Sequence, residues 1–309
     1  MESTLKTNYP KTAGRTSRWS DADLLGVLIL ASALPYLNTL SGGFVYDDLT
    51  QVTDNPYIVN FHHLRSIFTT GVWSFVGRQG VTNYYRPLMT LGYLVCYHLF
   101  GKLAFGYHLV NLTLYVMVVC ILFGMTLAMF RRRDLAFMAA LLFALHPVHT
   151  ESVAWIAAVT DLELTLFFLV AFWFFLKTAN SDGGRFVPAM AGMEICFVLA
   201  LLSKEQALML PLLATIYEHG YREDRKTTSW WQKISRYGLL WLIEVGYLLL
   251  RIRVFGSVAP HPRSAKMRWP QAFLSALALI AQYVWKMFWP VRLCAFYVFH
   301  KAASLLDPR

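Results

Sequence analysis

Charged residues are scarce in this chain of 309 residues, of which only 15% are Asp, Glu, Lys or Arg. Soluble globular domains carry about 25% charged residues, so the chain is not an ordinary cytosolic enzyme. Its 57% hydrophobic content also excludes a disordered protein. The four cysteines form no CxxC pair and lie in or beside apolar segments. This excludes a disulfide-stapled secreted module and favours buried apolar roles for the cysteines over metal or redox chemistry.

Long apolar runs dominate the chain instead, and the mean hydropathy is +0.44. At about 20 residues per helical span, we expect an all-α, polytopic helical membrane protein with about seven to eight spans. The net charge of +10 comes from short clusters of Lys and Arg between the apolar runs. This distribution indicates membrane topology or binding to lipid phosphate, and not nucleic-acid binding.

The charge pattern also predicts the orientation. Residues 1–20 carry four cations and one acid, so we expect them to be cytoplasmic, followed by an uncleaved first span and a membrane domain over 21–309. Residues 41–106 are then a structured extracytoplasmic loop, and their apolar stretch 86–100 fits a helix at the membrane interface.

Two C-terminal segments leave alternatives open. By alternation, residues 251–270 form an extracytoplasmic loop, yet they carry five cations and no acid. Either the span count is off by one, or an anionic ligand binds there. Residues 271–289 are apolar and Trp-rich, and fit either a last span or a surface helix.

Ionisable residues beside a span indicate a functional site. The neighbouring carboxyl groups of Asp47 and Asp48 repel each other, and burial could raise the pKa of one to that of a general base. The alternative is a solvated turn or a helix cap. Arg86, held by Pro87, could grip a phosphate through two hydrogen bonds or extend into lipid headgroups.

Two further motifs interrupt the apolar runs. The first, His146 to Glu151, contains an internal proline, so its His pair lacks the helical spacing of a metal site. It fits the wall of a cavity or a capped helix boundary. In the second, Lys204 and Glu205 form either an anion clamp or a local ion pair. His108 and Asn111 share a helix face, as site residues or as contacts between helices.

Six motifs in one order carry a family resemblance. They are Phe44 to Asp48, Tyr85 to Leu88, His108 to Asn111, His146 to Glu151, Ser203 to Glu205 and Tyr283 to Pro290. Together they resemble the transmembrane and tetratricopeptide-repeat-containing O-mannosyltransferase family and its bacterial relatives, within the C-type glycosyltransferase superfamily. The resemblance covers roughly residues 44–297.

The resemblance implies an inverting membrane glycosyltransferase. Its donor would be a polyprenyl-phosphate sugar, often mannose, and its acceptor a hydroxyl, commonly Ser or Thr of an extracytoplasmic protein. The membrane would be the bacterial inner membrane, or the endoplasmic reticulum in a eukaryote. Cationic side chains would stabilise the leaving phosphate, so no cofactor is required, and a divalent metal stays open as an alternative.

The resemblance also assigns residues. The family's acidic pair falls on Asp47 and Asp48, one of which would be the catalytic base. The donor phosphate would contact Arg86 and Lys204 of the family motifs, and the charge pattern of the basic segment 251–270 adds Arg251 and Arg253. The site would be lined by Tyr85, His108, Asn111, His146, His149, Glu151, Asp161 and Glu205.

The chain departs from the family pattern at two points. Relatives usually carry an Arg where this chain has Val159, and Glu163 begins the following apolar run. We also expect the tetratricopeptide-repeat domain to be absent. These departures motivate the alternative of an inactive membrane scaffold or lipid-phosphate binder. A transporter ranks last, because no internal symmetry is visible.

Overall fold

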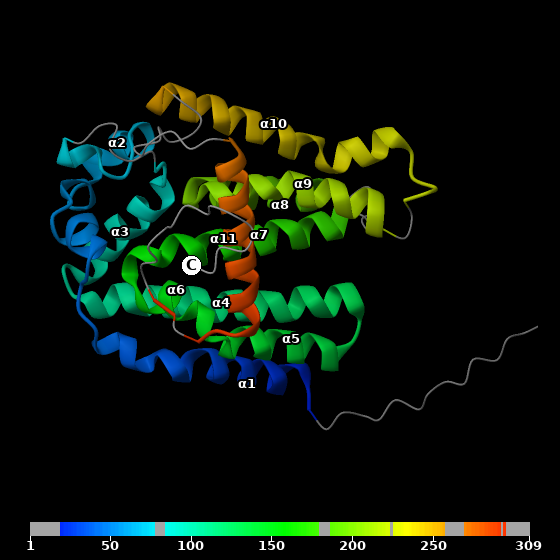
Figure 1. Ribbon diagram of the computed structural model, residues 1–309, viewed down its shortest axis with the longest axis horizontal. Coiled ribbons are helices and arrows are strands. Elements are labelled where there is room, and N and C mark those ends of the chain that lie inside the picture. The colour runs from blue at the N-terminus through cyan, green and yellow to red at the C-terminus, as the bar shows by residue number, and fades with distance from the viewer. Residues whose placement is uncertain are drawn as a thin grey trace, which may run out of the picture.

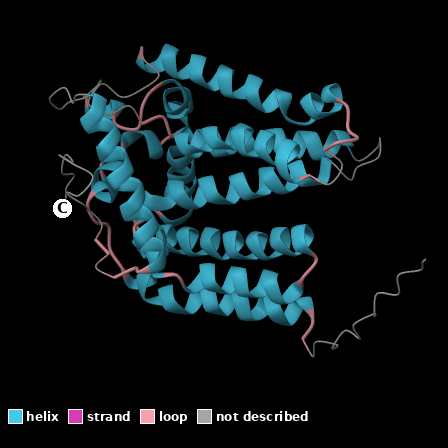
Figure 2. Cartoon of the chain, turned by 45° about the vertical axis from the view of Figure 1, so that its right-hand side comes forward, coloured by secondary structure: helices cyan, strands magenta, loops and turns pink. Residues whose placement is uncertain are grey.

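The computed structural model (Figure 1) describes residues 19–77, 84–178, 186–222, 225–256, 269–291 and 293–294. Within these ranges all regular structure is helical, as Figure 2 shows. The expected all-α class is therefore confirmed. Most of the expected cytoplasmic segment 1–20 lies outside the described residues, as do residues 257–268 of the expected basic loop.

One half of the bundle contains three packed helices. Helix α1 (Asp21–Ala33) starts at a capping box, in which Ser20 and Asp23 exchange side-chain and backbone hydrogen bonds, and runs on into η1 (Leu34–Ser41). It packs against α4 (Ala104–Phe130) and α5 (Arg133–Leu145). On α5, alanines recur at every fourth position on the buried face, and such small residues let helix backbones approach closely.

The other half contains α7 (Val159–Thr178), α8 (Phe186–Ser203), α9 (Met209–Ile216) and α10 (Trp230–Phe255). These helices bury a second apolar cluster rich in Phe, Leu and Ala. Residues between the helices form short elements: η6 (Pro147–His149), α6 (Thr150–Ala154), η7 (Ile156–Ala158), η8 (Glu205–Leu208) and η9 (Tyr217–Tyr221).

The first loop folds over one end of the bundle, at the left of Figure 1. It contains η2 (Leu49–Thr53), η3 (Pro56–Ile58), η4 (Phe61–His63), α2 (Leu64–Thr69), η5 (Ser74–Val76) and α3 (Pro87–Phe100). Val52, Ile58 and Ile67 of the loop share a buried cluster with Cys96 of α3 and Ile156 of η7. The first loop is thus structured, as expected, and we call its side the loop-1 end.

Among the residues that the structure describes, four helical segments are long and apolar enough to cross a membrane: Asp21–Ser41, Ala104–Phe130, Ile156–Thr178 and Phe186–Ser203. Helices α5 and α9 have only 13 and 8 residues, short of the roughly 20 that a span needs. The count of seven to eight spans therefore stays a prediction.

The expectation of a loop starting at residue 251 is wrong. Helix α10 continues to Phe255 and ends at Gly256, whose φ of 72° is the left-handed conformation that favours glycine at a helix end. The two arginines do not stop the helix, because Arg has high helix propensity. Helix α11 (Trp269–Phe288) runs across the direction of the long helices in Figure 1.

Candidate active site

A strained turn presents the two neighbouring carboxylates at the loop-1 end. Tyr46, which directly precedes them, has a φ of 50°, a conformation that costs a bulky L-residue on the order of 1–2 kcal/mol. Asp48 stabilises this turn, because its Oδ2 accepts a hydrogen bond from the Val45 amide at 3.0 Å. The Asp48 amide in turn donates to the Val45 carbonyl at 3.0 Å. The backbone strain therefore persists because a hydrogen-bonded box surrounds it.

Asp48 also joins the first loop to a distant part of the chain. Its side chain is completely buried, and its Oδ1 accepts a hydrogen bond from the Ala157 amide of η7 at 2.8 Å. Burial raises the pKa of Asp48 to about 6, and the two amide hydrogen bonds oppose this rise. Both carboxylate oxygens are thus engaged by backbone, which is the chemistry of an anchor.

Asp47 faces a different environment. It is only partly buried, and burial raises the pKa of its carboxyl group while the positive charge of Arg86 lowers it. Asp47 therefore lies within electrostatic reach of Arg86 and keeps access to the surface. Of the two carboxylates, Asp47 is the one positioned to exchange a proton with a bound molecule.

Arg86 lies between the first loop and the bundle. It precedes Pro87 at the start of α3, its guanidinium stacks 4.5 Å from the ring centre of Tyr84, and its Nε is 3.9 Å from Glu205 Oε2. The Arg86 side chain is only 16% exposed. A loosely paired, largely desolvated guanidinium can accept an anionic partner that offers better hydrogen-bond geometry.

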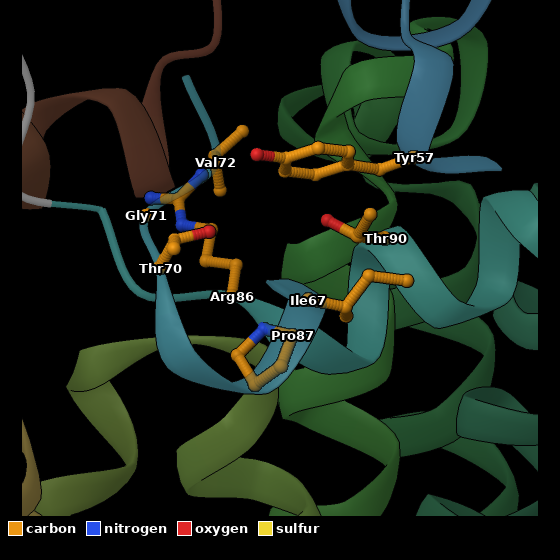
Figure 3. A pocket seen from close by; sticks show the side chains of 8 residues that line it. All are labelled: Tyr57, Ile67, Thr70, Gly71, Val72, Arg86, Pro87 and Thr90. Atoms are coloured by element: carbon orange, nitrogen blue, oxygen red, sulfur yellow. The ribbon is translucent and has the colours of Figure 1, made fainter. Parts of the chain in front are cut away.

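A small pocket adjoins Arg86 (Figure 3). Its wall includes Tyr57 of η3, Thr70 and Thr90, and the Arg86 side chain extends along it. The cavity volume is ≈ 10 Å³, which is room for about one water molecule. This pocket is therefore too small for a sugar ring, and we place the reacting groups outside it.

A second ion pair lies beside Arg86 and Glu205. Lys204 Nζ is 2.5 Å from Asp161 Oδ1 near the start of α7. Partial desolvation raises the pKa of the Glu151 carboxyl group on α6, and the negative charge of Asp161 raises it further. The positive charge of Lys204 lowers it. The predicted residues Glu151, Asp161, Lys204 and Glu205 are thus brought together at the loop-1 end.

The two histidines of the Pro147 motif have structural partners. His146 Nδ1 accepts from the Val148 amide at 3.2 Å, capping η6, and His146 Nε2 lies 2.9 Å from the Met287 carbonyl oxygen. The ring of His149 packs 4.1 Å from that of Phe143. Burial lowers the pKa of His149 to about 4, so the ring is neutral at physiological pH.

Three predicted site residues contact the segments around the charged cluster: His108, Asn111 and Tyr85. Asn111 Nδ2 donates at 2.9 Å to the carbonyl of Trp155, which lies between α6 and η7, and at 3.4 Å to that of Val153 in α6. His108 Nε2 lies 3.0 Å from the point that a Cβ on Gly42 would occupy, so it packs directly against the first loop. Tyr85 is buried, and its hydroxyl donates to the Phe68 carbonyl at 2.8 Å.

The two arginines of α10 point in different directions. Arg251 is 3% exposed, and its Nη1 lies 3.4 Å from the hydroxyl of Tyr247. Tyr247 in turn lies within electrostatic reach of Glu205 and Arg86, so it links Arg251 to the ion-pair cluster. Arg253 is exposed. Only one of this predicted pair is directed into the bundle.

Two charged residues near this site were not among the predicted site residues. Glu163 is 8% exposed, and its Oε1 lies 3.4 Å from the point that a Cβ on Gly92 of α3 would occupy. The Glu163 carboxyl group therefore lies against α3. The second is Lys286 of α11, whose charge lowers the pKa of Glu151. In the sequence, only the position of Lys286 within the motif Tyr283 to Pro290 marks it as a candidate.

The part of the chain that the structure describes contains no group of three His, Cys, Asp or Glu side chains arranged to hold a metal ion. The charged groups at the loop-1 end instead alternate in sign, as in the pairs Arg86–Glu205 and Lys204–Asp161. Such a cluster can bind a phosphate through its cations and accept a proton through a carboxylate.

The apolar helices and this charged cluster at their ends define an integral membrane protein with a polar site beside the bilayer. Sequence comparison relates it to known proteins. The chain is 30% identical over 272 residues to the protein O-mannosyl-transferase F38B6.6 of Caenorhabditis elegans, covering 86% of this chain and 36% of that relative. It is 36% identical over 208 residues to the mouse protein O-mannosyl-transferase TMTC1, covering 64% and 22%.

A third relative is the mouse protein O-mannosyl-transferase TMTC2, which is 32% identical over 186 residues, covering 59% of this chain and 22% of the relative. The resemblance to the transmembrane and tetratricopeptide-repeat-containing O-mannosyltransferase family is thereby confirmed, and the chain is related to that family. The chain spans 36% or less of the length of these relatives. No family model matches the chain, and no solved structure matches it.

Proposed function

We propose that this chain is the membrane part of a glycosyltransferase that moves a mannosyl group from a polyprenyl-phosphate donor to a Ser or Thr hydroxyl of a protein. The proposal rests on one observation: the two adjacent carboxylates differ in their hydrogen-bond partners and in their exposure. Asp48 is committed to backbone amides, while Asp47 stays accessible beside Arg86.

The reaction requires a base and a stabilised leaving group. The acceptor oxygen attacks the anomeric carbon, the bond from that carbon to the phosphate oxygen breaks, and the hydroxyl proton passes to Asp47. The electron pair of the broken bond leaves with the polyprenyl phosphate, whose developing charge is stabilised by Arg86 and Lys204. Attack from the face opposite the phosphate inverts the anomeric configuration.

The site faces the extracytoplasmic side in this proposal. The end of α4 opposite to loop 1 carries Arg131, Arg132 and Arg133, and basic residues Arg225, Lys233 and Arg236 lie near the start of α10. Clusters of this kind favour the cytoplasmic side of a membrane. The membrane is a bacterial inner membrane, or the endoplasmic reticulum in a eukaryote.

Sugar transfer in proteoliposomes tests the proposal. We expect wild type to transfer mannose from polyprenyl-phosphate mannose to a Ser/Thr-containing peptide. Asp47→Asn should slow transfer by roughly 10²- to 10⁴-fold, the usual contribution of a general base. Asp54→Asn is the matched control, because Asp54 is an exposed acid of the same loop.

Two results would contradict the proposal. Full transfer by Asp47→Asn would remove Asp47 as the base. Donor binding by wild type without transfer to any hydroxyl acceptor would favour the inactive scaffold. The apolar Val159, buried in the cluster under the first loop where relatives usually carry an Arg, is the observation behind that second candidate.

A further inference from the structure

The C-terminal end of helix α11 is hydrogen-bonded to the motif His146 to Glu151. Of the residues of α11, only Ser275 is buried. The last turn of the helix, however, meets the Pro147 motif, because His146 Nε2 lies 2.9 Å from the Met287 carbonyl oxygen. His146 Nδ1 accepts from the Val148 amide, so Nε2 carries the proton and donates it to this carbonyl. The hydrogen bond satisfies one of the carbonyls that a helix leaves without an intrahelical partner at its C-terminal end.

This attachment brings a cation to the charged cluster. Lys286 directly precedes Met287, and its charge acts on Glu151 together with the charges of Asp161 and Lys204. The Lys286 ammonium lies 5.9 Å from the ring centre of Tyr283. Two lysines from helical elements far apart in the sequence therefore act on the same carboxylate.

The charge balance gives this second lysine a role. Six carboxyl groups gather at the loop-1 end: Asp47, Asp48, Glu151, Asp161, Glu163 and Glu205. Among the described residues, Arg86, Lys204 and Arg251 oppose them besides Lys286. The phosphate of the donor is a diester with one negative charge, the polyprenyl phosphate that leaves is a monoester with up to two, and like charges close together repel. A further cation is therefore needed where the phosphate enters.

The surroundings of Lys286 favour a lipid phosphate over a soluble one. Trp285, Phe288 and Trp289 flank it and are 64%, 79% and 60% exposed. Aromatic side chains of this kind concentrate at the interface between membrane and water. An isoprenoid chain could lie against these rings while its phosphate reaches the lysine.

We propose that Lys286 binds the phosphate of a polyprenyl-phosphate ligand, and that the His146 hydrogen bond to Met287 holds α11 in the position that allows this. The inference rests on the proposed function for the identity of the ligand. It adds a phosphate-binding residue from a helix that the assigned site does not include.

Binding can be tested separately from transfer. The full chain in phosphatidylcholine nanodiscs is titrated with polyprenyl phosphate without a sugar, and with the uncharged polyprenol as a second probe. We expect Lys286→Gln to weaken polyprenyl-phosphate binding roughly 10- to 100-fold, the cost of one charge-assisted hydrogen bond, and to leave polyprenol binding unchanged. Lys286→Arg should recover most of the affinity. Lys177→Gln removes one positive charge at the opposite end of α7 and serves as the control.

The outcomes separate the two proposals. Equal polyprenyl-phosphate affinity of wild type and Lys286→Gln overturns the role of Lys286, even if sugar transfer is normal. No binding of polyprenyl phosphate by wild type overturns it as well. Displacement of polyprenyl phosphate by equimolar inorganic phosphate or phosphatidic acid would overturn the preference for an isoprenoid ligand. If binding depends on Lys286 while wild type transfers no sugar, the inference stands and the proposed function fails.

Discussion

Replacing Asp48 with Asn is expected to loosen the first loop while leaving the proposed base in place. Asp48 Oδ1 and Oδ2 accept backbone hydrogen bonds at 2.8 and 3.0 Å. An Asn side chain has one acceptor oxygen, and its NH₂ group cannot accept from the second amide. One bond between a charged group and a buried amide is therefore lost, at a cost of about 1.5–3 kcal/mol.

The buried Cys96 offers an assay for this loss. Cys96 shares an apolar cluster with Val52, Ile58 and Ile67 of the first loop, so a maleimide reaches its thiol only when the loop opens. The other three cysteines, Cys120, Cys196 and Cys294, are replaced by Ala in every variant. A loss of 1.5–3 kcal/mol should accelerate labelling of Cys96 by roughly 10- to 100-fold.

The comparison with Asp47→Asn makes this experiment decisive. Asp47 is expected to affect sugar transfer and not the docking of the loop, so its variant should label Cys96 at the wild-type rate. Labelling of Asp48→Asn within a factor of two of wild type would refute the anchoring role of Asp48. Rapid labelling of both variants would refute the division of labour between the two carboxylates.

Two further predictions concern pH and a buried amide. The folded pKa of Asp48 is raised to about 6 from an ordinary value of 3.8, so the stabilisation that protonation of Asp48 adds to loop docking is fully present below pH 3.8 and is lost as the pH rises through 6, while the charged carboxylate at higher pH keeps both amide hydrogen bonds. Lowering the pH from 7.5 to 5.5 should stabilise docking by about 1 kcal/mol through this group, seen as slower Cys96 labelling after correction for thiolate fraction. Asp48→Asn should lack this stabilisation. Its remaining pH dependence then comes from His149, whose pKa is lowered to about 4, so that lowering the pH destabilises the folded state. Asn111→Leu removes the donor to the Trp155 and Val153 carbonyls and should destabilise the bundle by about 1–3 kcal/mol. Thermal unfolding in detergent measures this, and an unchanged midpoint would contradict the prediction.

The sequence by itself determined the helical membrane class and the site motifs. Long apolar runs with few charges admit few other folds, because backbone polar groups in lipid must be satisfied within the segment. The order of the polar motifs was likewise enough to predict the family resemblance, which the relatives confirm. The expectation of a loop over residues 251–256 is wrong because arginines mark the end of an apolar run but do not terminate a helix.

Only the tertiary structure decided which partners each charged residue has. Asp47 and Asp48 are indistinguishable in sequence, and the amide of Ala157, more than 100 residues away, engages one and not the other. Arg251 is buried and Arg253 exposed because residues two positions apart on a helix point in different directions. Lys286 meets the site because His146 holds the end of α11. Hydropathy reports how each segment partitions into the membrane, whereas the environment of a charge depends on which segments pack beside it.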